Sequence, residues 1–173
     1  MEKVIIIILH IIKKRNKMKE FITKSIVFKP YEDSVDKKQI EDLLPFEFEG
    51  KDDFVEFYLL HNGVYFPDGV RLSTEPFIPT YERAYNMHEV ELFYPIRRIK
   101  SMWDAIKEQG FEVERFLENH FPFARDAGGN NYFIEVPSGE ISYVSWEYGI
   151  EEGLALVAPS FKDFCCSMLP LED

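Results

Sequence analysis

The chain has 173 residues, enough for one domain, and its 46% hydrophobic fraction excludes global disorder. Its 16 Phe, 9 Tyr and 2 Trp residues favour a fold with a β-sheet, because aromatic side chains are enriched in strands. The formal net charge of −11 argues against general nucleic-acid binding, and it suits either a basic partner or solubility alone.

The first residues differ in composition from the rest. Residues 4–12 form an apolar run that is followed by a basic segment over 13–17. The run is shorter than the roughly 17–25 residues of a membrane-spanning helix, and a secretory signal would carry its positive charges before the run. We therefore predict that 1–17 are a non-native or disordered extension and that the natural start is Met18, with a peripheral membrane anchor as the alternative. Residues 18–173 are predicted to form a single domain.

Two helices are predicted early in this domain. Residues 34–44 carry apolar side chains at helical spacing and stop before a proline. Asp52 or Asp53 is expected to cap the second helix, which runs through the segment DFVEFYLLHN. The pair Asn62 and Gly63 then supplies the left-handed conformation that ends many helices.

Strands are predicted next. Val64–Phe66 and Val70–Leu72 flank a Pro-Asp-Gly turn signal, so they are expected to be two short strands. An irregular loop over 74–86 leads to a further strand, Val90–Ile96.

A helical region follows. A capping box that begins at Ser101 is expected to open a helix that Gly110 closes, and 112–119 adds one or two helical turns. Three glutamates of these turns are a secondary candidate for an acidic binding surface, or they form a solvated helical face: Glu112, Glu114 and Glu118.

Residues 121–148 give the clearest β pattern. Three β-type runs are separated by DAGGN and PSG, which predicts two hairpins and a three-stranded meander. Because a strand rather than a helix follows DAGGN, the loop lacks the helix dipole of a phosphate site. We assign its residues structural roles: Gly128 and Gly129 can accept positive φ in a tight hairpin, and Asp126 can bond to backbone amides of its own turn.

The C-terminal part completes the predicted fold. Leu154–Ala158 is a further strand, and a capping box at Ser160 opens a helix with an apolar face that docks on the sheet. The residues of this face are Phe161, Phe164, Cys165, Met168 and Leu169. The pattern predicts an α+β domain with a largely antiparallel or mixed sheet and flanking helices.

We expect no enzyme and assign no catalytic, cofactor-binding or metal-binding residue. The four histidines show no metal-ligand spacing, and neither a GxSxG elbow nor a Walker-type loop is present. Cys165 and Cys166 are successive positions of the predicted helix, so only one can face the core. They form no disulfide framework, which is typical of a reducing compartment, so we expect a cytoplasmic protein.

Three segments together resemble the SUKH superfamily, which contains fungal Smi/Knr cell-wall regulators and bacterial toxin-immunity proteins. They are Phe54–Gly69, Phe121–Tyr143 and Ala158–Leu169, and the resemblance runs from about Ser34 to Leu169. The run FARDAGGN with the strands that follow it is the most specific part. The chain departs from the family pattern Asn-Gly-Gly at Val64, where the second glycine is lost.

The resemblance implies an α+β fold without enzymatic activity or cofactor. It implies an immunity protein that neutralises a polymorphic, contact-dependent bacterial toxin. We expect this cognate partner to be a basic protein, with a nuclease as the favoured class. The alternative is an interaction protein of cell-wall or stress regulation, but the long disordered flanks of the fungal members are absent here. We expect neither nucleic acid nor membrane as a partner, and we leave the oligomeric state open.

The family's motif residues are structural, so the partner surface is predicted from chemistry. Interface centres favour aromatic residues, and an acidic face speeds association with a basic protein. One segment combines both, and we predict partner binding for Trp146, Glu147, Tyr148, Glu151 and Glu152. The alternative is an aromatic core strand followed by a solvated acidic turn.

Overall fold

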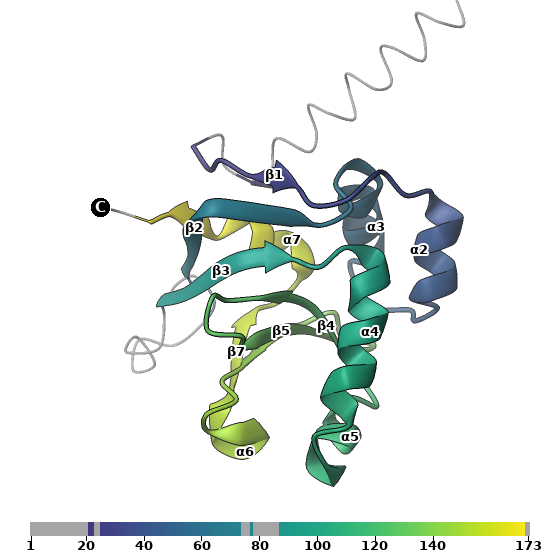
Figure 1. The fold of residues 1–173 in the computed structure, drawn as a ribbon, viewed down its shortest axis with the longest axis vertical. Coiled ribbons are helices and arrows are strands. Elements are labelled where there is room, and N and C mark those ends of the chain that lie inside the picture. The colour runs from purple at the N-terminus through teal and green to yellow at the C-terminus, as the bar shows by residue number, and fades with distance from the viewer. Residues whose placement is uncertain (1–20, 23–24, 74–76, 78–86, 172–173) are drawn as a thin grey trace, which may run out of the picture.

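The centre of the molecule is an antiparallel sheet (Figure 1). The computed structural model describes residues 21–22, 25–73, 77 and 87–171. The predicted extension over 1–17 and the predicted start at Met18 lie outside these residues, as does nearly all of the predicted loop over 74–86. In the described part, eight strands and six helices confirm the α+β class, and every strand pair is antiparallel.

The strands follow chain order across the sheet from β1 to β7, and β8 pairs with β2. The predicted meander is confirmed by β4, β5 and β6. The bounds are β1 Lys29–Pro30, β2 Val64–Ser73, β3 Met87–Phe93, β4 His120–Arg125, β5 Asn131–Glu135, β6 Ile141–Val144, β7 Leu154–Ala158 and β8 Met168–Pro170.

The prediction of two short strands around Pro-Asp-Gly is wrong. β2 is one strand of 10 residues, and its register against β3 shifts between Tyr65 and Val70. Gly69 has a φ of 65°, so the turn-forming residues make an irregularity inside the strand instead of a hairpin. β3 occupies one side of β2, and β1 and β8 share the other side, one after the other.

The six helices lie around this sheet. Their bounds are α2 Lys37–Leu43, α3 Lys51–Leu60, α4 Ile96–Lys107, α5 Phe111–Phe116, α6 Gly149–Gly153 and α7 Phe161–Cys166. The helices predicted over 34–44 and from DFVEFYLLHN are confirmed as α2 and α3.

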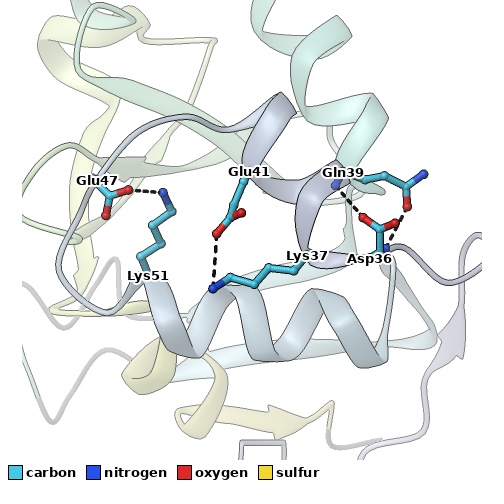
Figure 2. A network of polar contacts seen from close by, with 6 residues as sticks. All are labelled: Asp36, Lys37, Gln39, Glu41, Glu47 and Lys51. Atoms are coloured by element: carbon cyan, nitrogen blue, oxygen red, sulfur yellow. Dashed lines mark hydrogen bonds and ion pairs between the residues drawn. The ribbon is translucent and has the colours of Figure 1, made fainter.

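Local polar contacts fix the start of α2. The Asp36 carboxylate accepts a hydrogen bond from the Gln39 backbone N–H at 2.8 Å, and the Gln39 side chain accepts one from the Asp36 backbone at 2.9 Å (Figure 2). Lys37 and Glu41 form an ion pair at 3.4 Å one helical turn apart. The two bonds between Asp36 and Gln39 form a capping box, which satisfies backbone donors that a helix start leaves unpaired.

The first turn of α3 differs from the prediction that Asp52 or Asp53 caps it. The N-cap is Gly50, with a φ of 77° and no side-chain bond. The two aspartates lie inside the first turn, where their charges interact favourably with the helix dipole. Lys51 at the helix start pairs with Glu47 at 2.6 Å (Figure 2).

α4 begins five residues before the predicted capping box. Pro95 is its N-cap, and the strand expected to reach Ile96 ends at Phe93. Ser101 lies within the helix, where its hydroxyl donates to the Arg98 carbonyl at 3.1 Å. The side chain that bonds to the start of α4 comes from elsewhere: Asn62 Oδ1 accepts from the Ile96 backbone N–H at 2.9 Å.

The last predicted helix is too long at its C-terminal end. α7 ends at Cys166, and Met168 begins β8, which pairs with Leu72 of β2. The apolar residues Phe161 and Phe164 are buried as the helical pattern requires. Met168 is buried as well, but as a strand residue.

The sheet has an apolar cluster on each face. Tyr132 and Ile134 of β5 belong to the larger cluster, whereas Phe133 between them belongs to a smaller one. Because neighbouring strand residues point to opposite faces, the two clusters lie on opposite sides of the sheet. Side chains of α4 and α5 complete the smaller cluster, among them Ile106, Phe116 and Leu117.

Candidate partner-binding surface

The predicted segment over 146–152 is a turn followed by the short helix α6, rather than a strand end and loop. Trp146 is half-buried at its start. Its indole Nε1 donates to Asn131 at 2.8 Å, its backbone N–H donates to Asn130 at 3.0 Å, and its ring meets the edge of Phe133. The Trp146 side chain therefore anchors the segment to β5 and presents little of its ring to a partner.

The other four predicted residues are exposed. Glu147, Glu151 and Glu152 form no ion pair with any described residue, and Tyr148 is 60% exposed. The acidic turn of the alternative interpretation is thus present, with an exposed aromatic ring beside it.

A close backbone contact holds this turn in shape. The Ser145 backbone N–H donates to the Gly153 carbonyl at 3.0 Å. A Cβ atom at Gly153 would lie 2.3 Å from the Ser145 carbonyl oxygen, so only glycine fits at this point. The contact closes residues 145–153 into a loop that carries the acidic side chains outward.

The second acidic candidate lies at the same end of the molecule. Glu112, Glu114 and Glu118 are exposed on and just after α5, and Glu114 pairs with Lys107 at 3.1 Å. α5 and α6 contact each other, and both pack against the smaller apolar cluster (Figure 1). We call the six glutamates of this surface the acidic end: Glu112, Glu114, Glu118, Glu147, Glu151 and Glu152.

Sequence analysis treated the two acidic segments as separate candidates. Both segments pack against the smaller apolar cluster on one face of β5 and β6. The helices α5 and α6 cover side chains of this cluster, among them Phe133 and Val144. No local pattern in the sequence reports that shared support. The structure also places an exposed aromatic, Phe111 at 79% exposure, at the start of α5, and the prediction missed it.

The DAGGN loop is closed by its own bonds. The Asp126 carboxylate accepts from the Asn130 backbone N–H at 2.9 Å and from the Tyr143 hydroxyl at 2.8 Å. Gly129 has a φ of 89°, whereas Gly128 is not in the left-handed region, so only one of the two glycines uses the positive φ that both can accept. The bond from Trp146 to Asn130 links this loop to the acidic end.

Asn62 and Gly63 join three parts of the chain. The Asn62 amide donates to the Asp33 carbonyl at 2.8 Å and accepts from Ile96. Gly63 has a φ of 76°, and a Cβ there would lie 2.6 Å from the Pro95 nitrogen. Both residues thus set how closely the end of α3 approaches the start of α4.

A cavity of about 400 Å³ lies beside Asn62. Apolar walls come from Val35 and Leu43, and an ion pair of 2.9 Å between Arg97 and Glu32 lies at its lining. The charged groups at this cavity are therefore partly matched within the chain itself.

The titratable groups near the sheet are shifted by burial. Burial lowers the pKa of His88 to about 4, against the opposing effect of Asp126, and the His88 ring lies 4.4 Å from that of Tyr143. Burial also lowers the pKa of His120 and raises that of the Cys165 thiol. Cys165 is buried and Cys166 exposed, which confirms that only one of them faces the core.

Two kinds of feature are absent from the described residues. No group of three or more His, Cys, Asp or Glu side chains in this part of the chain could hold a metal ion. Among the same residues, no helix has the length and apolar character needed to cross a membrane. What the acidic end does offer is exposed carboxylates and aromatic rings on a rigid support.

The comparisons with known proteins agree with the resemblance noted above. The model of the SMI1 / KNR4 family (SUKH-1) matches residues 32–167, which include the Asn62 junction, the DAGGN loop, α6 and α7. A search among curated proteins finds no match.

Proposed function

The chain belongs to the SMI1 / KNR4 family (SUKH-1), and on this basis we propose that it is an immunity protein. It binds a cognate polymorphic bacterial toxin and neutralises it by occupying the toxin surface rather than by a reaction. The partner is a basic protein, with a nuclease as the favoured class.

The observation that carries this proposal is the acidic end. Six exposed glutamates from α5 and α6 converge there, and five of them have no ion-pair partner among the described residues. A field of one sign raises the rate of association with an oppositely charged protein by roughly 10- to 1000-fold at low salt. The exposed rings of Phe111 and Tyr148 supply apolar contact area next to that charge.

A non-catalytic regulator of cell-wall or stress pathways is the competing function for a chain of this family. The two differ in their partner. An immunity protein is expected to bind one toxin tightly and to rescue growth of cells that make it, whereas a regulator is not. We favour immunity because a concentrated, unpaired acidic surface suits a basic enzyme.

The direct test uses the C-terminal toxin domain that this proposal expects the gene immediately upstream to encode. The triple variant Glu147→Lys, Glu151→Lys, Glu152→Lys should lose association rate with that domain by at least about tenfold at low salt, and the loss should shrink at high salt. Surface plasmon resonance at two salt concentrations measures both effects. Thermal unfolding should change little, because the three side chains are exposed.

A matched triple variant separates local from general electrostatics. Glu49→Lys, Asp52→Lys, Asp68→Lys changes the net charge equally, and all three positions are exposed and belong to neither α5 nor α6. It should bind the toxin domain far better than the acidic-end variant. Equal binding by the two variants removes the acidic end from the interface, and absence of binding and of growth rescue by the unmodified chain contradicts the immunity function.

A further inference from the structure

The strand β7 leaves one edge of the sheet open. It pairs with β6 on one side, and the described residues contain no strand on its other side. Apart from the pairing with β6, no backbone hydrogen bond joins 154–158 to another described segment. A strand paired on one side only presents a row of free N–H and C=O groups.

The composition of β7 is unusual for such an edge. Its sequence LALVA has no charge and no proline, and Leu154 and Leu156 are 42% and 44% exposed. Proteins usually protect open edges with lysine, proline, charge or a β-bulge. β7 has such protection only at its C-terminal end, where the register shift against β6 leaves Val157 as an extra residue and Pro159 follows the strand, whereas Leu154 to Leu156 have none. The opposite edge of this sheet has those features, in Lys29 and Pro30 of β1 and Pro170 of β8.

The two exposed leucines lie on the same face. Leu154 pairs with Val144 and Leu156 with Ser142, so both point to the side of the smaller apolar cluster. Ala155 between them points to the other face and is small. A second strand can therefore approach closely and find apolar side chains on one face only.

We propose that two copies of this chain pair antiparallel along β7 and join their sheets into one. In the pairing centred on Ala155, each Leu154 lies opposite Leu156 of the second copy, and the two Ala155 residues face each other. This makes two cross-strand leucine pairs from one symmetric contact. A two-fold interface of this kind is closed, so it yields a dimer and not a fibre.

The charges at the ends of β7 favour a second copy in this orientation. Glu151 and Glu152 immediately precede the strand. In the antiparallel pair the two Glu152 residues lie at opposite ends, about six residues or roughly 20 Å apart. That distance exceeds the screening length of about 8 Å at physiological salt, so their repulsion is small. A parallel pair would place the same glutamates side by side.

A positive charge follows the other end of β7. Lys162 is exposed in the first turn of α7, four residues after the end of β7, and its Nζ lies over the Phe21 ring at 5.5 Å. The dimer interface is short, because β7 has five residues. Such a contact is below the size of standard stable interfaces, so the dimer should be weak and should depend on concentration.

The first test measures self-association of the full chain by sedimentation velocity over a series of micromolar concentrations. We expect a shift from monomer to dimer with rising concentration. Leu156→Lys should weaken dimerisation by at least about tenfold, because each dimer gains two lysines and loses both leucine pairs. Leu171→Lys is the control, since Leu171 is 39% exposed but follows β8 at the protected edge, and it should leave dimerisation unchanged.

The second test checks the register. Ala155→Cys in a Cys166→Ser background should oxidise to a covalent dimer, because directly opposite strand residues approach the Cβ separation of a disulfide. Leu171→Cys in the same background should not. Cys165 is buried and takes no part.

Three results would overturn the proposal: a monomer at every concentration, a dimer unaffected by Leu156→Lys, or equal cross-linking at positions 155 and 171. A chain that is monomeric alone but loses toxin binding with Leu156→Lys would assign β7 to the toxin instead. Sedimentation and cross-linking do not depend on the immunity function, so the two proposals fail separately.

Discussion

At the residue scale, the two glycines of the DAGGN loop have different backbone requirements. Gly129 has a φ of 89°, whereas Gly128 lies outside the left-handed region. Gly129→Ala should reduce the free energy of unfolding by about 1–2 kcal/mol, which is the usual cost of a left-handed conformation for a residue with a Cβ. Urea denaturation measures this loss.

Gly128→Ala is the matched control for that prediction. A Cβ at Gly128 would lie 3.3 Å from Asp126 Oδ1, a tight contact that small side-chain movements relieve. The loss of stability should therefore be smaller than for Gly129→Ala. Equal losses would show that backbone conformation is not what requires glycine in this loop.

At the element scale, the start of α4 depends on a side chain from another part of the chain. Asn62 is 4% exposed and bonds to both Ile96 and Asp33. Asn62→Ala leaves the buried Ile96 N–H and the part-buried Asp33 carbonyl without these partners, and it should cost about 1–3 kcal/mol of folding free energy. Thermal or chemical unfolding monitored by circular dichroism gives the value.

Ser101→Ala tests the competing capping box that the sequence suggested. Because Ser101 is exposed inside α4, its replacement should change stability by no more than about 0.5 kcal/mol. If Ser101→Ala proved as costly as Asn62→Ala, the helix would start where the sequence pattern placed it.

The same elements show which features a sequence reveals. The meander of β4 to β6 was predictable, because its strands are separated by turn residues and each contact is local. The start of α4 was not, since its cap lies 34 residues away at Asn62. β8 was missed because a buried Met168 fits the apolar period of a helix as well as a strand. The residues of the acidic end were identified, but their meeting depends on packing across the sheet.

At the scale of the whole molecule, the N-terminal boundary of the folded unit can be tested. Phe21 and Ile22 belong to the larger apolar cluster, with exposures of 2% and 6%. A chain that starts at Met18 keeps both and should unfold at the same denaturant concentration as the full chain, while aggregating less because the β-branched run is removed.

A chain that starts at Ser25 is the control. It loses Phe21 and Ile22 and should be destabilised by about 3–5 kcal/mol or more, the range for deleting large core side chains. A loss of several kcal/mol on removal of 1–17 alone would show that the apolar run is part of the core.

β1 and β8 pair with different parts of the same side of β2, and this arrangement has a consequence for synthesis. Arg71 of β2 pairs with Leu169 of β8, so its partner is made 169 − 71 = 98 residues later. At roughly 5–20 residues per second, the nascent chain waits on the order of 5–20 seconds with this half of β2 uncovered. The strands from β3 to β7 are translated in that interval. The last strand pair of the sheet to form therefore involves β2, which is among the first strands to be made. Chaperones that shield open strands would act on β2 during translation.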